Sequence, residues 1–487
     1  MKKKDKGLSA GQLTMMALGT VIGGSFFLGS AVAIEAAGPA IIISYIVGGI
    51  LVYFILFALS EMTVANPDSG SFRTFTADVF GPGAGFVVGW VYWTGMVLSM
   101  SSEATAVSIL VRKWIPNLSI ALLGSIIIIL VTLLNLLGAN KLSKLESGLA
   151  AVKLLALVSF IILALLLIIG VIPGTPALGA GELTKESFMP GGIKGIAGSM
   201  LIVIFTYAGF EIIGLAASEA ENPRETVPKA IKNTVLCLVG LYIVTILVLL
   251  PLIPTTQLNE SVSPMVAALN RWGIGWAGTV LNFVLITAIL STMLAAMFGL
   301  GRMMRSLADE GQAPKWLKDE KDVPYRGILF SGLAMLMGLG FGLLLPRVYL
   351  FLISSGGFAL LFTYAAIMAT HIRFRKKNGC PPEGKCQMAG YPYTSWIALF
   401  SMIIIILSMP FISGQASGLI AGIIMIVLYS VIYLVMKSIQ SPNKNNATKK
   451  EIYNKNYQAG FSTEFSKELT EDDKEKDKNK ECNKCNK

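Results

Sequence analysis

The sequence predicts an all-α, polytopic membrane protein with about 12 transmembrane helices. Of its 487 residues, 54% are hydrophobic and only 14% are charged, whereas a soluble chain of this size carries about 25% charged residues. Apolar runs such as 120–137, 154–172 and 235–250 are long enough to cross a bilayer at about 1.5 Å per residue. Composition and run length therefore both place the chain in a membrane.

Twelve candidate spans follow one another along the chain. Each is an apolar stretch between polar or charged segments, and the expected ranges are 12–36, 40–62, 84–111, 119–137, 147–171, 195–218, 233–253, 275–301, 327–345, 348–371, 394–411 and 416–437. We expect one membrane domain over 12–437, preceded by a short segment, 1–11. Spans 1–5 cover about 12–171, spans 6–10 about 195–371 and spans 11–12 about 394–437.

The last segment, 438–487, differs in composition from the rest of the chain. It is rich in Lys, Glu, Asp and Asn and has few apolar residues. Such a composition does not bury enough apolar surface to offset the entropy of folding. We therefore expect a disordered tail.

The basic residues predict the orientation of the spans. The formal net charge is +11, which by itself is also typical of nucleic-acid-binding proteins. However, 33 of the 40 Lys and Arg residues fall in the loops and ends on one side, and six fall on the other: Arg112, Lys113, Lys185, Lys194, Arg271 and Arg347. Because basic loops stay inside, we expect both termini in the cytoplasm, with the protein in the plasma membrane. The distribution of positive charge thus indicates the orientation of the spans, and no nucleic-acid partner is expected.

Catalytic and metal chemistry find little support in the sequence. There is one histidine, His371, which we expect at the membrane interface, and the sequence contains no Ser-His-Asp set, paired-carboxylate pattern or zinc motif. Five cysteines fall in a span or on the expected cytoplasmic side, where thiols stay reduced, so no disulfide framework is expected. The sequence therefore predicts no enzyme activity, no metal and no cofactor.

Two spans carry glycines in the middle of the membrane. Span 1 contains the pair Gly23 and Gly24, and span 6 contains Gly209 two residues before Glu211. A broken helix persists in a membrane only where protein or a wet cavity satisfies its backbone, and matched breaks in two halves of a chain indicate the substrate site of an inverted-repeat transporter. The alternative for span 1 is a helix-packing face, with Gly19 and Gly23 four residues apart.

A broken helix offers both signs of partial charge. Freed N–H groups at the start of the outer half favour an anion, and freed carbonyls at the end of the inner half favour a cation. We expect a carboxylate against Gly23 and Gly24, and an ammonium against carbonyls near Val21, Phe205 and Ala208. The two breaks therefore predict a zwitterionic solute.

Three ionisable residues lie at membrane depth, where a charge costs about 2.5–3.5 kcal/mol on insertion scales. Lys153 in span 5 is a candidate proton carrier; the alternative is a lysine whose head reaches the inner interface. Glu103 in span 3 is a candidate to pair with a substrate amine, to carry a proton or to bridge helices. For Glu211 we favour bracing of the broken span 6 over substrate contact.

Several motifs together resemble the amino acid–polyamine–organocation (APC) permeases, most closely the bacterial amino acid transporter branch. They are the glycine-rich stretch 19–29, the segments 60–72 and 81–93, the stretch 205–211 running into 219–231, and the segments 302–308 and 311–324. The resemblance covers about residues 8–440. It implies a LeuT-like fold of five plus five inverted helices and two more, alternating access, and uptake of an amino acid with protons across the lipid bilayer.

The resemblance also implies roles for individual residues. On the span 1 side it assigns the substrate's carboxylate and amine to Val21, Gly23, Gly24 and Ser25; on the span 6 side it assigns substrate contacts to Phe205, Ala208 and Gly209, with Phe205 as a gate. It places Lys153 where sodium-coupled relatives bind an ion, and it matches Glu103 to the branch's span 3 acid. The sequence therefore predicts an amino acid permease, with a transporter-like amino acid receptor that binds without transport as the alternative.

Overall fold

The computed structural model describes residues 7–65, 71–137, 139–172, 176–217, 220–319, 323–345, 347–380 and 387–439. Residues up to Ser430 belong to one compact unit, and a second unit begins at Val431, of which 431–439 are described. The tail predicted to be disordered lies outside the described residues from position 440 onward.

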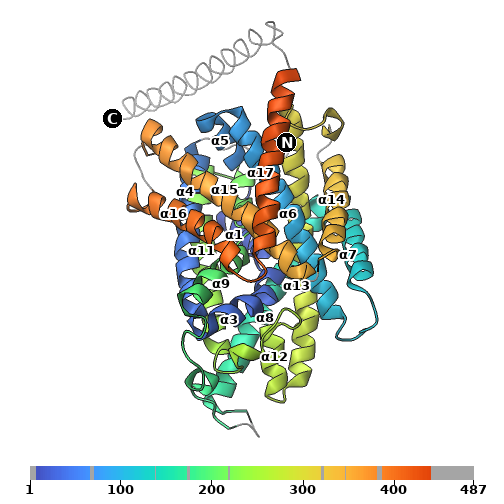
Figure 1. Cartoon of the computed structure of the whole chain (residues 1–487), viewed down its shortest axis with the longest axis vertical. Helices are drawn as coiled ribbons and strands as arrows, with labels where there is room; N and C mark the ends of the chain where they lie inside the picture. Colours follow the sequence, from blue (N-terminus) through green and yellow to red (C-terminus); the bar gives the residue numbers. More distant parts are fainter. Residues whose placement is uncertain are drawn as a thin grey trace, which may run out of the picture. The chain divides into compact units, whose positions relative to one another are not determined.

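The described elements are helices (Figure 1), apart from one isolated bridge between Leu8 and Ala220. The α-helices are α1 (Ala10–Val21), α2 (Gly24–Phe27), α3 (Gly29–Ala37), α4 (Ile41–Ala65), α5 (Phe72–Phe80), α6 (Pro82–Val111), α7 (Ile120–Asn135), α8 (Ala139–Ile169), α9 (Gly192–Thr206), α10 (Ile212–Leu215), α11 (Pro223–Leu249), α12 (Pro264–Arg271), α13 (Gly275–Asp309), α14 (Tyr325–Leu343), α15 (Val348–Asn378), α16 (Tyr393–Ser408) and α17 (Ala416–Ile439). Short 3₁₀ turns are η1 (Gly38–Ala40), η2 (Gly181–Thr184), η4 (Thr255–Gln257), η5 (Lys315–Leu317) and η6 (Met409–Phe411).

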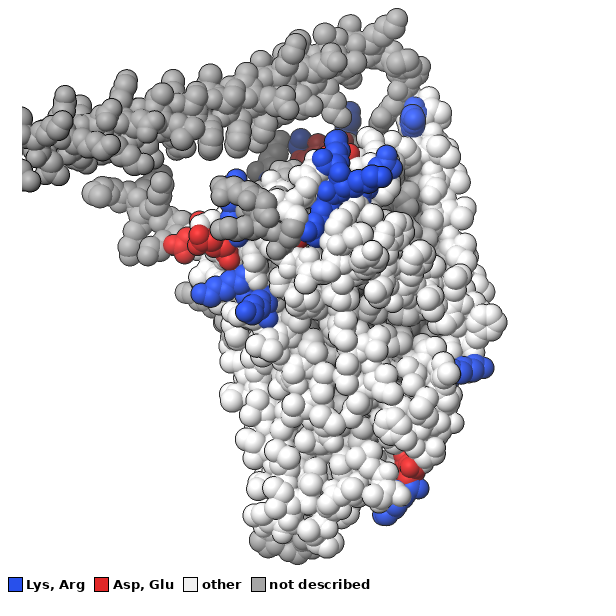
Figure 2. Space-filling view, turned by 90° about the vertical axis from the view of Figure 1, so that its left-hand side faces the viewer, with Lys and Arg blue, Asp and Glu red and all other residues white. Residues whose placement is uncertain are grey.

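These helices confirm the predicted fold class. Among the described residues, nine helical stretches are long and apolar enough to cross a membrane, and two shorter apolar helices, α7 and α9, lie at expected spans 4 and 6. The first of the nine, Gly24–Ala65, combines the second half of span 1 with span 2 around the turn η1. On the face in Figure 2, most charged side chains lie toward one end and the middle is largely uncharged. Each expected span is thus matched by a helix or a broken helix.

Two short helices were not predicted. The helix α5 buries Phe72 and Phe75 against α6 and α15, while α12 packs on α13. Four spans also extend as helix beyond their apolar part: α8 begins at Ala139, α11 begins at Pro223, α13 continues to Asp309 and α15 continues to Asn378. These additions lie at the ends of the spans, where polar residues make hydropathy a poor guide.

Span 1 is broken as expected. A capping box between Ser9 and Gln12 starts α1, which ends at Val21. Extended backbone at Ile22 and Gly23 follows, and α2 begins at Gly24. The first half packs on α8, α11 and α13, and α2 packs on α6, α9 and α13. The break therefore lies inside the helix bundle, between helices from both halves of the chain.

His371, expected at the membrane interface at the end of span 10, has its side chain inside the helix bundle. This residue is fully buried in α15, and its Nε2 lies 2.7 Å from Glu61 Oε2. The other carboxylate oxygen of Glu61 accepts hydrogen bonds from the backbone N–H groups of Gln387 and Met388, at 2.7 and 2.8 Å. Arg375 Nη1 lies 3.5 Å from Glu61 Oε2. A buried acid thus draws the histidine into the protein and ties α4 to α15 and to the start of the segment before α16.

We expect Glu61→Ala to lower the free energy of unfolding by about 3–5 kcal/mol, because it leaves a buried histidine, an arginine and two N–H groups without their acceptor. The measurement is the midpoint of thermal unfolding in detergent. The control is Thr63→Val on the same helix, since Thr63 is fully buried and its hydroxyl has no hydrogen-bond partner among the described residues. Equal unfolding midpoints for the two variants would contradict this role for Glu61.

The expectation of reduced cysteines also needs correction. Cys380, which follows α15, forms a disulfide, and its Sγ accepts a hydrogen bond from Arg375 Nη2 at 2.9 Å. Cys237 on α11 is free. Residue spacing alone does not predict this bond. Cys386, Cys482 and Cys485 lie outside the described residues.

Candidate functional site

The two helix breaks face each other. Span 6 stops being helical after Thr206, and Gly209 adopts φ of +108°, a conformation that favours glycine, before α10 begins at Ile212. A Cβ atom at Gly209 would lie 3.2 Å from the carbonyl oxygen of Thr20 in span 1. The backbones of the two breaks are therefore within van der Waals reach of one another.

The start of α2 binds a carboxylate. The backbone N–H groups of Gly24 and Ser25 donate to the two carboxylate oxygens of Glu103, at 2.7 and 3.1 Å. These N–H groups are left without intrahelical partners by the break, and a negative charge is favourable at a helix N-terminus. A Cβ atom on Gly24 would lie 2.5 Å from Glu103 Oε2, so the close approach requires glycine at this position. We call the Gly24 and Ser25 N–H groups the amide cradle.

The end of α1 binds a cation. Lys153 Nζ, fully buried on α8, donates to the Gly19 carbonyl at 2.5 Å and to Thr292 Oγ1 at 2.8 Å. Thr292 on α13 in turn lies 3.0 Å from the carbonyl oxygen of Ile22. A Cβ atom on Gly23 would lie 3.1 Å from Thr292 Oγ1. The ammonium thus satisfies one carbonyl that the break leaves open, at the negative end of the α1 dipole, and Thr292 satisfies another.

The second break is held by its own acid. Glu211 Oε2 accepts a hydrogen bond from the Gly209 N–H at 3.1 Å and one from Tyr364 Oη at 3.2 Å. Glu211 Oε1 accepts from Tyr92 Oη at 3.0 Å. The carboxylate is 1% exposed, and this geometry agrees with bracing. All three predicted intramembrane charges therefore bind the backbone of a broken helix, which offsets the cost of their burial.

A small cavity of about 20 Å³ lies between the breaks. Its lining includes six of the predicted site residues, namely Val21, Ser25, Glu103, Phe205, Ala208 and Gly209. Of the other four, Gly23 and Gly24 form the backbone of the first break, Lys153 lies against the end of α1, and Glu211 braces the second break. The cavity has room for about one water molecule. It is too small for an amino acid in this conformation.

The cavity also has walls that sequence reasoning did not identify: Thr20, Met96, Ser99, Met100, Thr292, Ala296 and Leu360. For three of these residues, the spacing in the sequence indicates the shared position. Met96, Ser99 and Met100 precede Glu103 by seven, four and three residues, so they share its helix face. Thr292 and Leu360 come from distant spans and are brought to the cavity only by packing.

Comparison with known proteins shows which family the chain belongs to. The family model of amino acid permeases matches residues 12–447. The γ-aminobutyric acid permease of Bacillus subtilis (strain 168) is 33% identical over 424 residues, which is 85% of this chain and 90% of that relative. The aromatic amino acid transport protein AroP of Escherichia coli O157:H7 is 32% identical over 415 residues, or 84% and 91% of the two chains.

The fold also resembles a solved membrane transporter. A crystal structure of the Eremococcus coleocola manganese transporter matches with a TM-score of 0.54 at 14% identity and covers 88% of this chain and 94% of that one. At that identity the likeness concerns the fold alone, and it fits the LeuT-like arrangement predicted above. With the family match extending over nearly all of the membrane helices, this multi-pass membrane protein belongs to the amino acid permease family.

Proposed function

We propose that the protein imports an amino acid across the plasma membrane by proton symport with alternating access. The named relatives are a permease and a transport protein for γ-aminobutyric acid and aromatic amino acids, which favours transport over sensing without transport. The observation that carries the proposal is the meeting of two broken helices at one cavity, where bare N–H groups already bind a carboxylate.

In this proposal the substrate's carboxylate takes the amide cradle. Glu103 occupies the cradle in the present conformation and moves away when substrate enters. The substrate's ammonium is oriented by carbonyls of Val21, Phe205 and Ala208, whose residues line the same cavity. A zwitterion then satisfies both ends of the break, which is the complementarity that helix dipoles favour.

We place the substrate side chain on the span 6 side of the cavity after the cavity has opened. Gly209 lines its span 6 wall without a side chain, while Phe205 is 4% exposed and lines the cavity at the end of α9. We propose Phe205 as the gate that must turn or shift before a solute enters. The closed volume of about 20 Å³ supports a transport cycle in which the site opens to one side at a time.

Proton coupling is proposed at Lys153. A protonated Lys153 binds the end of α1 and Thr292 on α13 at the same time. Loss of its proton removes the charge that the carbonyls of the break attract, and it weakens the link between these two helices. Protonation of one residue would thus bias the relative position of α1 and α13, and a proton would be carried with the substrate.

The proposed topology places both termini in the cytoplasm. Residues 12–437 would form the transport domain, with 1–11 and 438–487 as cytoplasmic extensions. The support is the asymmetry of Lys and Arg along the sequence.

The test is uptake by the purified protein in liposomes. Radiolabelled γ-aminobutyrate, L-phenylalanine and the remaining common amino acids are offered with and without an inward proton gradient. We expect saturable accumulation of at least one of them, driven by the gradient and abolished by a protonophore. Saturable binding without accumulation would establish the receptor function instead, and accumulation that ignores the proton gradient would remove the symport.

A further inference from the structure

A second cavity lies on the face that carries the loops after α6 and before α15. It has a volume of about 510 Å³ and is enclosed by the end of α6, the loop after it, the segment before α12, and α12, α13 and the start of α15. We call it the vestibule. Its polar lining consists of Arg112, Lys113, Glu260, Ser261, Asn270, Asn282, Arg347 and Tyr349.

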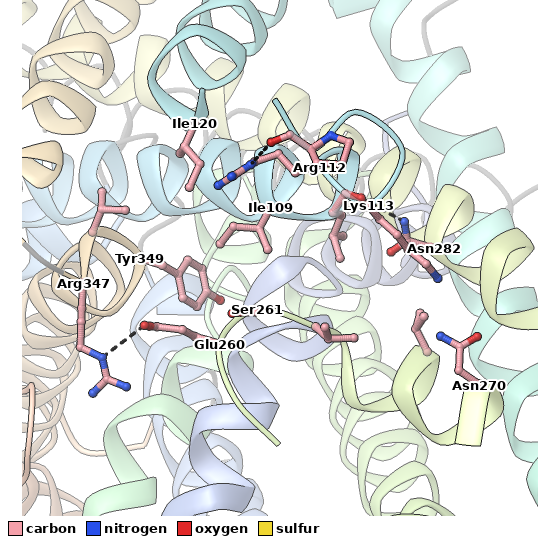
Figure 3. Close-up of a pocket in the computed structure, with 15 residues that line it drawn as sticks. Ile109, Arg112, Lys113, Ile120, Glu260, Ser261, Asn270, Asn282, Arg347 and Tyr349 are labelled. Atoms are coloured by element: carbon pink, nitrogen blue, oxygen red, sulfur yellow. Dashed lines mark hydrogen bonds and ion pairs between the residues drawn. The ribbon is translucent and has the colours of Figure 1, made fainter. Parts of the chain in front are cut away.

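The vestibule concentrates positive charge. Three of the six Lys and Arg residues expected in outer loops line it, against one acid, Glu260. In Figure 3, Arg112 and Lys113 lie together at the end of α6, and Arg347 lies across the cavity beside Glu260. Arg347 Nε binds Glu260 Oε1 at 3.2 Å, which neutralises one cation and leaves the net charge of the lining at about +2.

Neither Arg112 nor Lys113 has an ion-pair partner among the described residues. Arg112 Nε donates a hydrogen bond to the Pro116 carbonyl oxygen at 3.3 Å. Arg112 and Lys113 are both exposed residues. The second carboxylate oxygen of Glu260, Oε2, is buried and accepts no hydrogen bond from the described residues. The vestibule therefore offers two cationic groups, which suit a carboxylate. It also offers the partly exposed Glu260 side chain, whose Oε1 can accept a second hydrogen bond from an ammonium.

The vestibule is connected to the amide cradle through Tyr349. Tyr349 lines the vestibule and is 2% exposed, and its hydroxyl donates to the Gly24 carbonyl at 3.4 Å. Gly24 is also the residue whose N–H group binds Glu103. One tyrosine thus lines the vestibule and also contacts a residue of the amide cradle.

We propose that the vestibule is a separate outer binding site for an amino acid, in which Arg112 and Lys113 hold the carboxylate and Glu260 receives the ammonium. Charged clefts with low-dielectric walls concentrate ligands of opposite charge and raise their association rates by about 10- to 1,000-fold. A solute held here lies directly above Tyr349. The inference that the ligand is an amino acid rests on the proposed function; the positive potential of the vestibule does not.

The first arm of the test measures the potential without transport. Ser261→Cys places a thiol on the vestibule lining, and its reaction with an anionic and a cationic methanethiosulfonate reagent is followed in the full-length protein. The chain without this substitution supplies the background rate from native cysteines. We expect the anionic reagent to react about tenfold faster than the cationic one, relative to free cysteine, with the preference lost at about 1 M salt.

Matched variants assign the effect to the two cations. Arg112→Gln with Lys113→Gln should abolish the preference for the anionic reagent. Lys194→Gln is the control, because it removes an exposed cation expected in another outer loop that does not line the vestibule. Equal rates of the two reagents in the parent, or an equal loss with Lys194→Gln, would overturn the electrostatic part of the proposal.

The second arm tests occupancy. The amino acid that the wild type accumulates best is added before the anionic reagent. We expect at least fivefold protection of the Ser261→Cys thiol, maintained when Gly24→Val closes the cradle and lost with the Arg112 and Lys113 double variant. Uptake by the wild type without protection would overturn the vestibule site alone. Absence of uptake and binding for every amino acid, with charge selectivity intact, would instead contradict the proposed function.

Discussion

Lys153→Ala should abolish concentrative uptake in liposomes while leaving exchange of bound substrate intact. The substitution removes the one charge that links the Gly19 carbonyl to Thr292, so protonation no longer biases the helices. Lys153 is not part of the cavity lining, so the substrate's own contacts persist. Radiolabelled amino acid should equilibrate to equal concentrations inside and outside under a proton gradient, and counterflow should continue.

Two further variants separate charge from packing. Lys153→Met retains most of the side-chain length without the charge and should behave as Lys153→Ala does. The neighbouring Val152→Ala changes a side chain that is 39% exposed and should retain wild-type accumulation. Full gradient-driven accumulation in both Lys153 variants would rule out this lysine as the coupling residue.

Glu103→Gln should tighten substrate binding by roughly tenfold. The carboxylate holds both N–H groups of the cradle, and hydrogen bonds to a charged group contribute about 1.5–3 kcal/mol each. A glutamine oxygen accepts from one of these groups without the charge, and its NH₂ group does not accept from the other. The substrate's carboxylate therefore displaces the glutamine side chain from the amide cradle more easily than it displaces the Glu103 carboxylate. Equilibrium binding to the purified protein measures the change in Kd.

The sign of this change distinguishes two roles for Glu103. If the acid binds the substrate's ammonium, as the sequence also allows, removal of its charge weakens binding. Ser102→Ala is the control, because the Ser102 hydroxyl is buried at the same depth and bonds within its own helix to the Ser99 carbonyl. A Kd that rises with Glu103→Gln and stays constant with Ser102→Ala would exclude displacement.

The fold was predictable because lipid restricts the possible structures. Only helices span such a membrane in an apolar chain of this kind, so apolar runs identify the spans with little ambiguity. The helices α5 and α12 were missed because they have nine and eight residues and one buried face each. Such short amphipathic segments contain about two turns, which is too little periodicity to detect in a polar loop.

The candidate site was predictable where it is built from backbone groups. Broken helices need glycine and a partner charge, and both are visible in the sequence at Gly24, Gly209 and Glu211. The partner of Glu103 was left open because a sequence gives a residue's depth but not the direction of its side chain. The walls from α13 and α15, such as Thr292 and Leu360, depend on packing between spans that are far apart in the sequence.

The position of Lys153 also constrains how the molecule is made. Its two acceptors are 134 residues before it and 139 residues after it. During synthesis the fifth span therefore enters the bilayer with the Gly19 carbonyl available but with Thr292 still untranslated. Since a lysine in hydrocarbon costs about 2.5–3.5 kcal/mol, part of this cost is offset only after the eighth span, which carries Thr292, has been made. Neither half of the chain therefore supplies both hydrogen-bond acceptors of Lys153 by itself.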